Sequence, residues 1–144
     1  MSYAVDANVL LYASDQSSPR HASALQFLES RPADPDLFCL AWITLMAYLR
    51  ISTHPRVFAA PLSPAEALGN VDALLRLPRV RVLSEADGFL DTYRDVTRGI
   101  AVRGNLVPDA HLVTLLRQHG VRILYSADAD LRRFQFLDVR DPFA

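Results

Sequence analysis

Four aspartates that lie far apart in the chain have the chemical type and the position to form one acidic site. They are Asp6, Asp109, Asp128 and Asp130. Asp6 ends an apolar segment, and Asp109 follows a proline where we expect a helix to begin. Asp128 and Asp130 follow the apolar segment 121–125. Carboxylates that crowd together without cations repel one another and raise one another's pKa, and a hard divalent cation such as Mg²⁺ or Mn²⁺ relieves that conflict. Such a cation activates a water and neutralises the charge that develops on a phosphodiester, so these acids predict phosphoryl chemistry.

Each aspartate alone also has a structural explanation, because Asp is favoured at helix starts through capping and the helix dipole. Asp128 or Asp130 can cap the short turn 131–134. Asp6 is harder to explain in this way, since it lies within an apolar run where a lone charge is costly. The metal-site hypothesis therefore depends on all four acids lying at one edge of the fold.

The elements that position these acids are predicted from apolar patterning and from helix start and stop signals. Strands are expected at 3–6, 37–42, 79–83, 121–125 and 136–139, the third of them near a sheet edge. Helix starts are expected at Asn8, Ser18–Pro19, Thr44, Ser63–Pro64, Ser84 and Pro108, and helix ends before Pro32, near Pro55, at Arg98 and at Gly120. Strands that alternate with helices predict an α/β fold with a mainly parallel sheet and helices on both faces. In such a fold the carboxyl ends of the strands and the amino ends of the helices share one edge, where ligands bind.

The composition describes a single domain over residues 1–144 that buries a sizeable core, since 51% of the residues are hydrophobic. No apolar run approaches ~18 residues and no signal-peptide pattern opens the chain, so we expect a cytoplasmic protein without a membrane span. The single cysteine, Cys39, excludes a disulfide framework. All 15 basic residues are arginine, which argues against a Walker-type phosphate loop and against phosphatases and receiver domains that need a lysine. With a net charge of −1, the protein has no overall positive electrostatic field that would attract nucleic acid.

Five motifs, in order along the chain, are similar to those of PIN domains, and specifically to those of VapC-type toxin ribonucleases. They are residues 5–13, 42–50, 50–58, 104–111 and 126–130. The resemblance implies a three-layer α/β/α sandwich with a five-stranded parallel sheet, and cleavage of RNA by a water that Mg²⁺ or Mn²⁺ activates. It also implies a homodimer and inhibition by a VapB-type antitoxin. Apolar residues on the helices expected at 45–49 and 71–75 are the candidates for the dimer faces.

The resemblance also implies roles for individual residues. The implied catalytic metal ligands are Asp6, Asp109 and Asp128, with Asp130 as an outer ligand and with Asn8 and Ser126 orienting the acids. The candidates for contacts with the RNA backbone are Arg50, Arg56 and Arg103, because arginine binds phosphate through two parallel hydrogen bonds. A surface arginine equally often packs its stem on a helix or pairs with an acid. Other conspicuous side chains are expected to be structural: His54 and His111 at helix ends or on the surface, and Trp42 and Tyr48 in the core.

Ala47 is a departure from the family pattern. Many relatives have a glutamate three residues after a capping Thr or Ser, and here that place, counted from Thr44, is alanine. The change removes one acid and the reciprocal half of a capping box, and it argues against a second metal. It opens an alternative in which the chain is a catalytically weakened PIN module that only binds antitoxin or RNA. A small phosphatase or a nuclease acting on DNA is a third hypothesis, although the short chain has no inserted arch for flap processing.

Overall fold

The computed structural model describes residues 1–144 and contains a five-stranded sheet in which all neighbouring strands are parallel. The strands are β1 (Ser2–Val5), β2 (Leu37–Ala41), β3 (Val80–Leu83), β4 (Ile123–Tyr125) and β5 (Asp138–Arg140). Their order in the sheet is β3-β2-β1-β4-β5. The first strand of the chain therefore lies at the centre of the sheet, and β3 lies at an edge, as its alternating pattern predicted.

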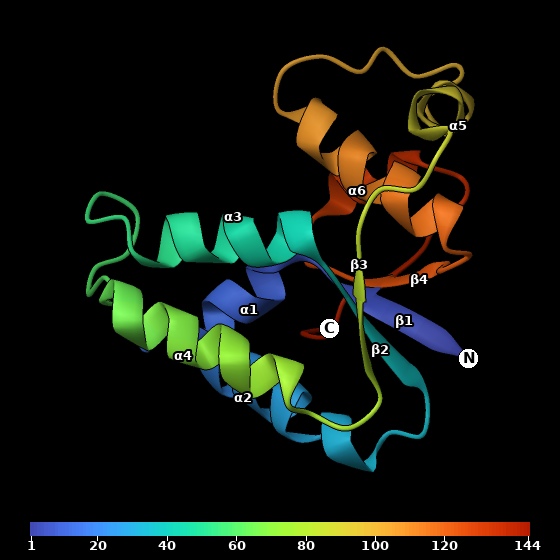
Figure 1. Ribbon diagram of the computed structural model, residues 1–144. Coiled ribbons are helices and arrows are strands. Elements are labelled where there is room, and N and C mark those ends of the chain that lie inside the picture. Colours follow the sequence, from blue (N-terminus) through green and yellow to red (C-terminus); the bar gives the residue numbers. More distant parts are fainter.

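Helices cover both faces of this sheet (Figure 1). They are α1 (Ala7–Ser14), α2 (His21–Glu29), α3 (Trp42–Ser52), α4 (Pro64–Leu75), α5 (Phe89–Val96) and α6 (Leu106–Gln118), with the short 3₁₀ helices η1 (Arg31–Ala33) and η2 (Ala129–Arg133). One hydrophobic cluster joins the sheet to α5 and α6, and a second joins it to α1, α2, α3 and α4. This arrangement is a three-layer α/β/α sandwich, which confirms the predicted fold class.

The central strand shows how the layers are built. Tyr3 and Val5 pack in the cluster with α1, α3 and α4, whereas Ala4 packs in the cluster with α6. Side chains alternate across a strand, so a strand covered by helices on both faces must be apolar throughout. All three residues are buried. This double coverage explains the uninterrupted apolar segment before Asp6.

Two helix starts follow strands so closely that the predicted caps are wrong. Asp6, not Asn8, caps α1: its side chain accepts a hydrogen bond from Ala7 N at 2.8 Å. Only Asp6 lies between the end of β1 and the start of α1, so this single connecting residue must serve as the cap. In the same way β2 runs directly into α3 at Trp42, without a side-chain cap, and Thr44 lies buried inside the helix.

Three other helices begin at positions that local signals did not predict. The Ser18 hydroxyl accepts from Arg20 N at 3.1 Å, and this local turn delays the start of α2 to His21. The segment after β3 bonds to Gln118 instead of entering a helix, so α5 begins at Phe89 and not at Ser84. Helix α6 begins two residues before Pro108, since proline is tolerated throughout the first turn.

Other boundary signals are confirmed. Ser63 and Glu66 form a complete capping box at the start of α4. Gly120 follows α6 with a φ of 69°, the left-handed conformation that a helix-ending glycine adopts. The helices are short, and none combines the length and the apolar character that crossing a bilayer requires.

Candidate functional site

The acidic site is built where two central strands end side by side. Val5 of β1 is paired with Tyr125 of β4. The amide of the next residue, Asp6 N, donates a hydrogen bond to the Tyr125 carbonyl oxygen at 2.9 Å. Asp6 follows β1 directly, and Ser126 follows β4 directly. Parallel pairing therefore brings together two residues that are 120 positions apart in the sequence.

The buried Ser126 hydroxyl connects three segments of the site. It donates to Asp6 Oδ2 at 2.9 Å and accepts from Asn8 Nδ2 at 3.1 Å and from Asp128 N at 3.0 Å. Asn8 also donates to Asp6 Oδ2 at 3.3 Å, and its Oδ1 accepts from Ala127 N at 3.3 Å. The structure thus joins Asp6, Asn8, Ser126 and Asp128 in one hydrogen-bond network, which fixes the orientation of the Asp6 carboxylate.

Asp6 lies in an environment that disfavours its charge. Burial raises the pKa of its carboxyl, and the nearby charge of Asp128 raises it further. The hydrogen bonds from Ser126 and from the Ala7 amide lower the pKa and oppose this effect, but burial has the larger influence. No cationic side chain contributes to the balance. Asp6 therefore has hydrogen-bond donors but no counter-ion.

Asp109, in the first turn of α6, is a second acid whose charge is disfavoured by its surroundings. Its pKa is raised from 3.8 to about 6, first by burial and then by the charges of Asp128, Asp6 and Asp130. The charges of these three acids reach Asp109 because the first turn of α6 lies at the same edge of the fold as the ends of β1 and β4. Its carboxylate receives neither a hydrogen bond nor an ion pair that would lower the pKa.

Asp128 and Asp130 begin the 3₁₀ helix η2. The Asp128 side chain caps η2 by accepting from Asp130 N through Oδ1 at 2.9 Å. The capping role considered for these residues is therefore present, and it belongs to Asp128. Capping occupies only one oxygen of the carboxylate, so it does not remove Asp128 from the acidic site. Asp130 is exposed at the outer side of the same turn.

The donor set at this edge suits a hard cation. The six ion pairs of the protein all lie elsewhere, so none of the four acids is neutralised by an arginine or a histidine. No three His, Cys, Asp or Glu side chains are grouped closely enough in this structure to hold a metal ion together. An open set of carboxylate oxygens is still compatible with Mg²⁺, which retains several waters and usually takes only one or two carboxylates from a protein.

The three candidate arginines for RNA contact are exposed and form no ion pair. Arg50 lies in the last turn of α3, Arg56 in the loop that follows, and Arg103 in the segment before α6. The loop with Arg56 adjoins the site, because its residues Val57 and Phe58 line a pocket of about 200 Å³ together with Asn8. None of the arginines approaches Asp6 or Asp109 closely enough to lower its pKa.

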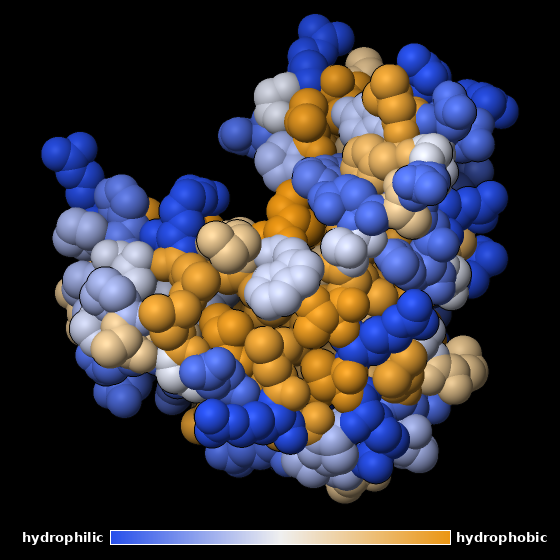
Figure 2. Space-filling view, viewed as in Figure 1, coloured by the Kyte–Doolittle hydropathy of each residue, from blue (hydrophilic) through white to orange (hydrophobic).

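Helix α3 departs from the expectations in three ways. Tyr48 is buried as predicted, but Trp42 is 47% exposed and is not a core residue. Leu45 and Val71, offered as parts of dimer faces, are buried in the sandwich. The exposed apolar residues of α3 are instead Trp42 and Met46, and Figure 2 shows apolar side chains gathered over this part of the surface. Because α3 begins at Trp42, Ala47 is not the partner of a Thr44 cap, and the capping-box argument for its effect is wrong.

The two histidines have structural contacts. His111 Nε2 lies 2.6 Å from Glu85 Oε1, and its ring contacts Phe89 edge-on. This bond lowers the pKa of Glu85. His54 Nδ1 accepts from Arg56 N at 3.0 Å in the turn after α3. Neither histidine belongs to the acidic site.

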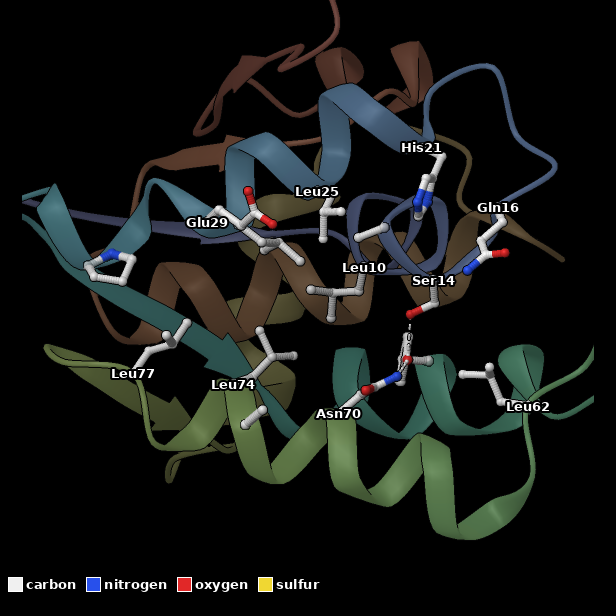
Figure 3. A pocket seen from close by; sticks show the side chains of 15 residues that line it. Leu10, Ser14, Gln16, His21, Leu25, Glu29, Leu62, Asn70, Leu74 and Leu77 are labelled. Atoms are coloured by element: carbon white, nitrogen blue, oxygen red, sulfur yellow. Dashed lines mark hydrogen bonds between the residues drawn. The ribbon is translucent and has the colours of Figure 1, made fainter.

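A separate cavity of about 400 Å³ lies between α1, α2 and α4 (Figure 3). Its lining is largely leucine and alanine, with a polar end at the Tyr48 hydroxyl, which bonds to Ser14 Oγ at 2.7 Å and accepts from Asn70 Nδ2 at 2.8 Å. None of the four acids lines it. The sequence analysis did not find this cavity, because its walls come from helices whose packing is set by tertiary contacts.

Comparison with known proteins identifies the family. The PIN domain model matches residues 3–137. The chain belongs to the PIN domain family. Among curated PIN proteins, it is 43% identical over 144 residues to "Ribonuclease VapC48" of Mycobacterium tuberculosis, covering 100% of this chain and 99% of the relative. It is 33% identical over 131 residues to "Ribonuclease VapC37" of the same species, covering 91% and 90%. These matches confirm the predicted resemblance to VapC-type PIN domains.

Solved structures show the same fold at low sequence identity. VapBC2 from Rickettsia felis, bound to a DNA fragment from its promoter, superposes with a TM-score of 0.68 at 15% identity, covering 97% of this chain and 98% of the other. VapC20 of Mycobacterium tuberculosis, described as a Sarcin-Ricin loop cleaving toxin, gives a TM-score of 0.66 at 18% identity, covering 96% and 99%. The PIN fold is thus shared over essentially the whole chain.

Proposed function

We propose that this chain is a VapC-type toxin ribonuclease that hydrolyses RNA phosphodiester bonds with Mg²⁺ or Mn²⁺ bound at the acidic edge of the sheet. The observation that carries the proposal is a set of carboxylates without counter-ions: Ser126 and Asn8 hold Asp6 Oδ2 at 2.9 and 3.3 Å, and no arginine or histidine pairs with any of the four acids. Like charges are crowded there without internal compensation, as expected for a cation site. The relatives named as ribonucleases, at 43% and 33% identity, support RNA as the substrate.

The proposed roles are those that the family resemblance implies. Asp6, Asp109 and Asp128 would be the metal ligands, with exposed Asp130 as an outer ligand. Because no three of these acids are grouped closely enough to hold an ion together, they would contact it partly through its retained waters. When bound, the ion supplies an activated water and stabilises the charge on the phosphate. Ser126 and Asn8 hold the Asp6 carboxylate in place through hydrogen bonds of 2.9 and 3.3 Å. Because these donors come from the ends of rigid elements, the carboxylate is preorganised before the ion binds.

The partners of the chain are also proposals. Structures whose descriptions name a VapBC complex match this fold, and they support a VapB-type antitoxin as the inhibitor. A homodimer is expected from the family resemblance. Arg50, Arg56 and Arg103 are the proposed contacts to the RNA backbone near the cleavage site, and their exposure without ion pairing is consistent with that role.

The direct test is cleavage of RNA by Asp6→Asn and Asp109→Asn variants in Mg²⁺ or Mn²⁺. Both variants should lose cleavage while their thermal unfolding remains cooperative. Asp72→Asn, which removes an exposed acid from α4, is the matched control and should cleave like the wild type. Wild-type cleavage in EDTA should also vanish. Unchanged cleavage by both site variants would show that the reaction takes place elsewhere.

A weakened PIN module is the second candidate function, because Ala47 places no acid on α3 where many relatives have glutamate. Calorimetric titration with Mn²⁺ separates the two candidates. The ribonuclease should bind Mn²⁺ below millimolar concentration, and binding should be lost in Asp109→Asn. A chain that binds RNA or antitoxin but no Mn²⁺ at millimolar concentration would be a binding module.

A further inference from the structure

A cluster of arginines lies at the end of the sheet opposite to the acidic site. Arg122 immediately precedes β4, whereas Ser126 of the acidic site immediately follows it. Arg117 comes from the last turn of α6, Arg133 from the last turn of η2, and Arg98 from the segment after α5. Together with Phe136 they line a pocket of about 650 Å³, which we call the arginine pocket.

Phe136 organises two of these arginines. The guanidinium carbons of Arg117 and Arg122 lie 5.0 and 5.1 Å from the centre of its ring, which is the geometry of a cation–π contact. Both side chains are exposed at the surface, where an arginine ordinarily samples many rotamers. Contact with a common ring restricts them, so part of the entropy cost of binding an anion between them is already met by the fold.

The charges of the arginine pocket are mostly uncompensated. Its only carboxylate, Asp95, pairs with Arg98 at 2.9 Å. Arg117, Arg122 and Arg133 form no ion pair, so three positive charges remain in a protein whose net charge is −1. The dipole of α6 explains an arginine at its carboxyl end, but it does not explain Arg122 or Arg133, which belong to other elements.

We propose that the arginine pocket binds a phosphate group of the RNA strand that is cleaved at the acidic edge; this inference rests on the proposed ribonuclease function. Four carboxylates at the cleavage edge repel a polyanion, and the protein has no overall positive field, so affinity for RNA must come from local cations. Guanidinium groups match phosphate oxygens bidentately. The arginine pocket gathers three unpaired guanidinium groups, whereas Arg50, Arg56 and Arg103 are single charges on separate segments.

The position of the arginine pocket sets the length of RNA that can use it. Four residue steps along β4 separate Arg122 from Ser126, which corresponds to about 13 Å in an extended strand. An RNA strand that reaches both ends must therefore be longer than about four stacked nucleotides. The arginine pocket should therefore contribute to the cleavage of long RNA and not to the cleavage of very short RNA.

The test is fluorescence anisotropy of labelled single-stranded RNA of about 20 and about 4 nucleotides with the full chain in EDTA, so that no cleavage occurs. Arg133 is not one of the two arginines with a cation–π contact to Phe136, and Arg133→Gln should weaken binding of the long RNA about tenfold and reduce the salt slope by about 0.7. The double variant Arg117→Gln/Arg122→Gln should weaken it further. In Mg²⁺, the KM for cleavage of the short RNA, which cannot extend from the acidic edge to the arginine pocket, should not change in Arg133→Gln. Arg132→Gln, an exposed neighbour outside the arginine pocket, is the control and should stay within about twofold of the wild type.

Three outcomes would overturn the inference. The first is an equal effect of Arg132→Gln and Arg133→Gln on long RNA, and the second is an equal rise in the KM for cleavage of short and of long RNA. The third is poly-glutamate binding that depends on the same arginines as strongly as RNA binding does, which would identify an acidic protein segment as the ligand. Thermal unfolding of every variant shows that a loss is not due to misfolding. If the chain binds RNA through these arginines but does not cleave it, the proposed ribonuclease function is wrong and the RNA-binding role of the arginine pocket stands. If it cleaves RNA and the arginines have no effect, the ribonuclease function stands and the role of the arginine pocket is wrong.

Discussion

The two ends of the parallel sheet carry unpaired charges of opposite sign in different environments. At the carboxyl edge, Asp6 and Asp109 are partly withdrawn from water and repel their acidic neighbours, so their charges are costly. In the arginine pocket at the other end, three guanidinium groups are exposed, and two of them rest on Phe136. Exposed charges of the same sign lower the stability of the protein only slightly, because solvent screens their repulsion. A bound cation would therefore stabilise the acidic edge, whereas the charges of the arginine pocket persist without a ligand.

The largest difference between the two ends should appear in catalysis. Asp128→Asn keeps an oxygen that can cap η2 but removes the charge, so it should reduce kcat on the order of 100-fold or more with little change in stability. Arg133→Gln should instead raise KM about tenfold and leave kcat nearly unchanged, since it removes binding far from the reacting bond. Steady-state kinetics on a long RNA measures both. A fall in kcat for Arg133→Gln as large as that for Asp128→Asn would contradict the division of roles.

The next effect concerns the hydrogen-bond network of the acidic edge. Ser126→Ala removes a hydroxyl that makes three hydrogen bonds to Asp6, Asn8 and the Asp128 amide. We expect the free energy of unfolding to fall by about 2 kcal/mol, because buried polar groups lose their partner. Urea denaturation measures this change, and Ser23→Ala, an exposed serine on α2, is the control. The pKa of Asp6 should also rise, since the Ser126 hydrogen bond lowers it.

A smaller effect should appear in the pH dependence of stability without metal. The pKa of Asp109 is about 6 in the folded protein, against 3.8 ordinarily. Between these values the folded state binds more protons than the unfolded state, so the free energy of unfolding falls as pH rises through this window. The side chain is partly exposed, and solvent screening reduces the expected loss to ~1 kcal/mol.

This loss is measured by denaturing the wild type and Asp109→Asn in EDTA at pH ~4 and pH ~7. The variant lacks the ionisable group, so its stability should fall ~1 kcal/mol less over this range than that of the wild type. Mn²⁺ added near neutral pH should stabilise the wild type and not the variant. Identical pH profiles for the two proteins would mean that Asp109 is not under electrostatic strain.

The smallest effect tests the balance of charge in the arginine pocket. Asp95→Asn removes its only carboxylate and frees Arg98 from an ion pair at 2.9 Å. Long RNA should bind about twofold to threefold more tightly, while stability changes little because the pair is exposed. Anisotropy titrations at low salt measure the gain. Asp91→Asn, which breaks a similar exposed pair with Arg94 outside the arginine pocket, should leave RNA binding unchanged.

The sequence predicted the layers of the fold because strand patterns are local. All five strands, the parallel pairing and the position of β3 at an edge followed from apolar runs and from their alternation with helices. Helix starts were less predictable, since Ser18 and Thr44 have the residue type of a cap but are used otherwise. Trp42 was wrongly assigned to the core, because a single apolar residue at the start of α3 does not reveal which side of the helix faces the sheet.

The meeting of Asp6 and Ser126 was also predictable, since it needs only that the ends of two parallel strands share an edge. The arginine pocket was not, because its arginines come from four separate segments and no spacing links them. Their meeting depends on how the carboxyl end of α6 packs beside η2 and β4. The polar contacts of Tyr48 were missed for the same reason: the sequence predicts that this ring is buried, but not that Ser14 and Asn70 meet its hydroxyl.

The central place of β1 has a consequence for how the protein opens. β1 is hydrogen-bonded to β2 on one side and to β4 on the other, and the amide of Asp6 still belongs to this ladder through its bond to Tyr125. Its amide protons should therefore be replaced by deuterium only when the whole domain unfolds, while those of edge strand β3 are replaced through local fraying. The carboxylate most deeply embedded in the acidic edge is thus attached to the part of the chain that unfolds last.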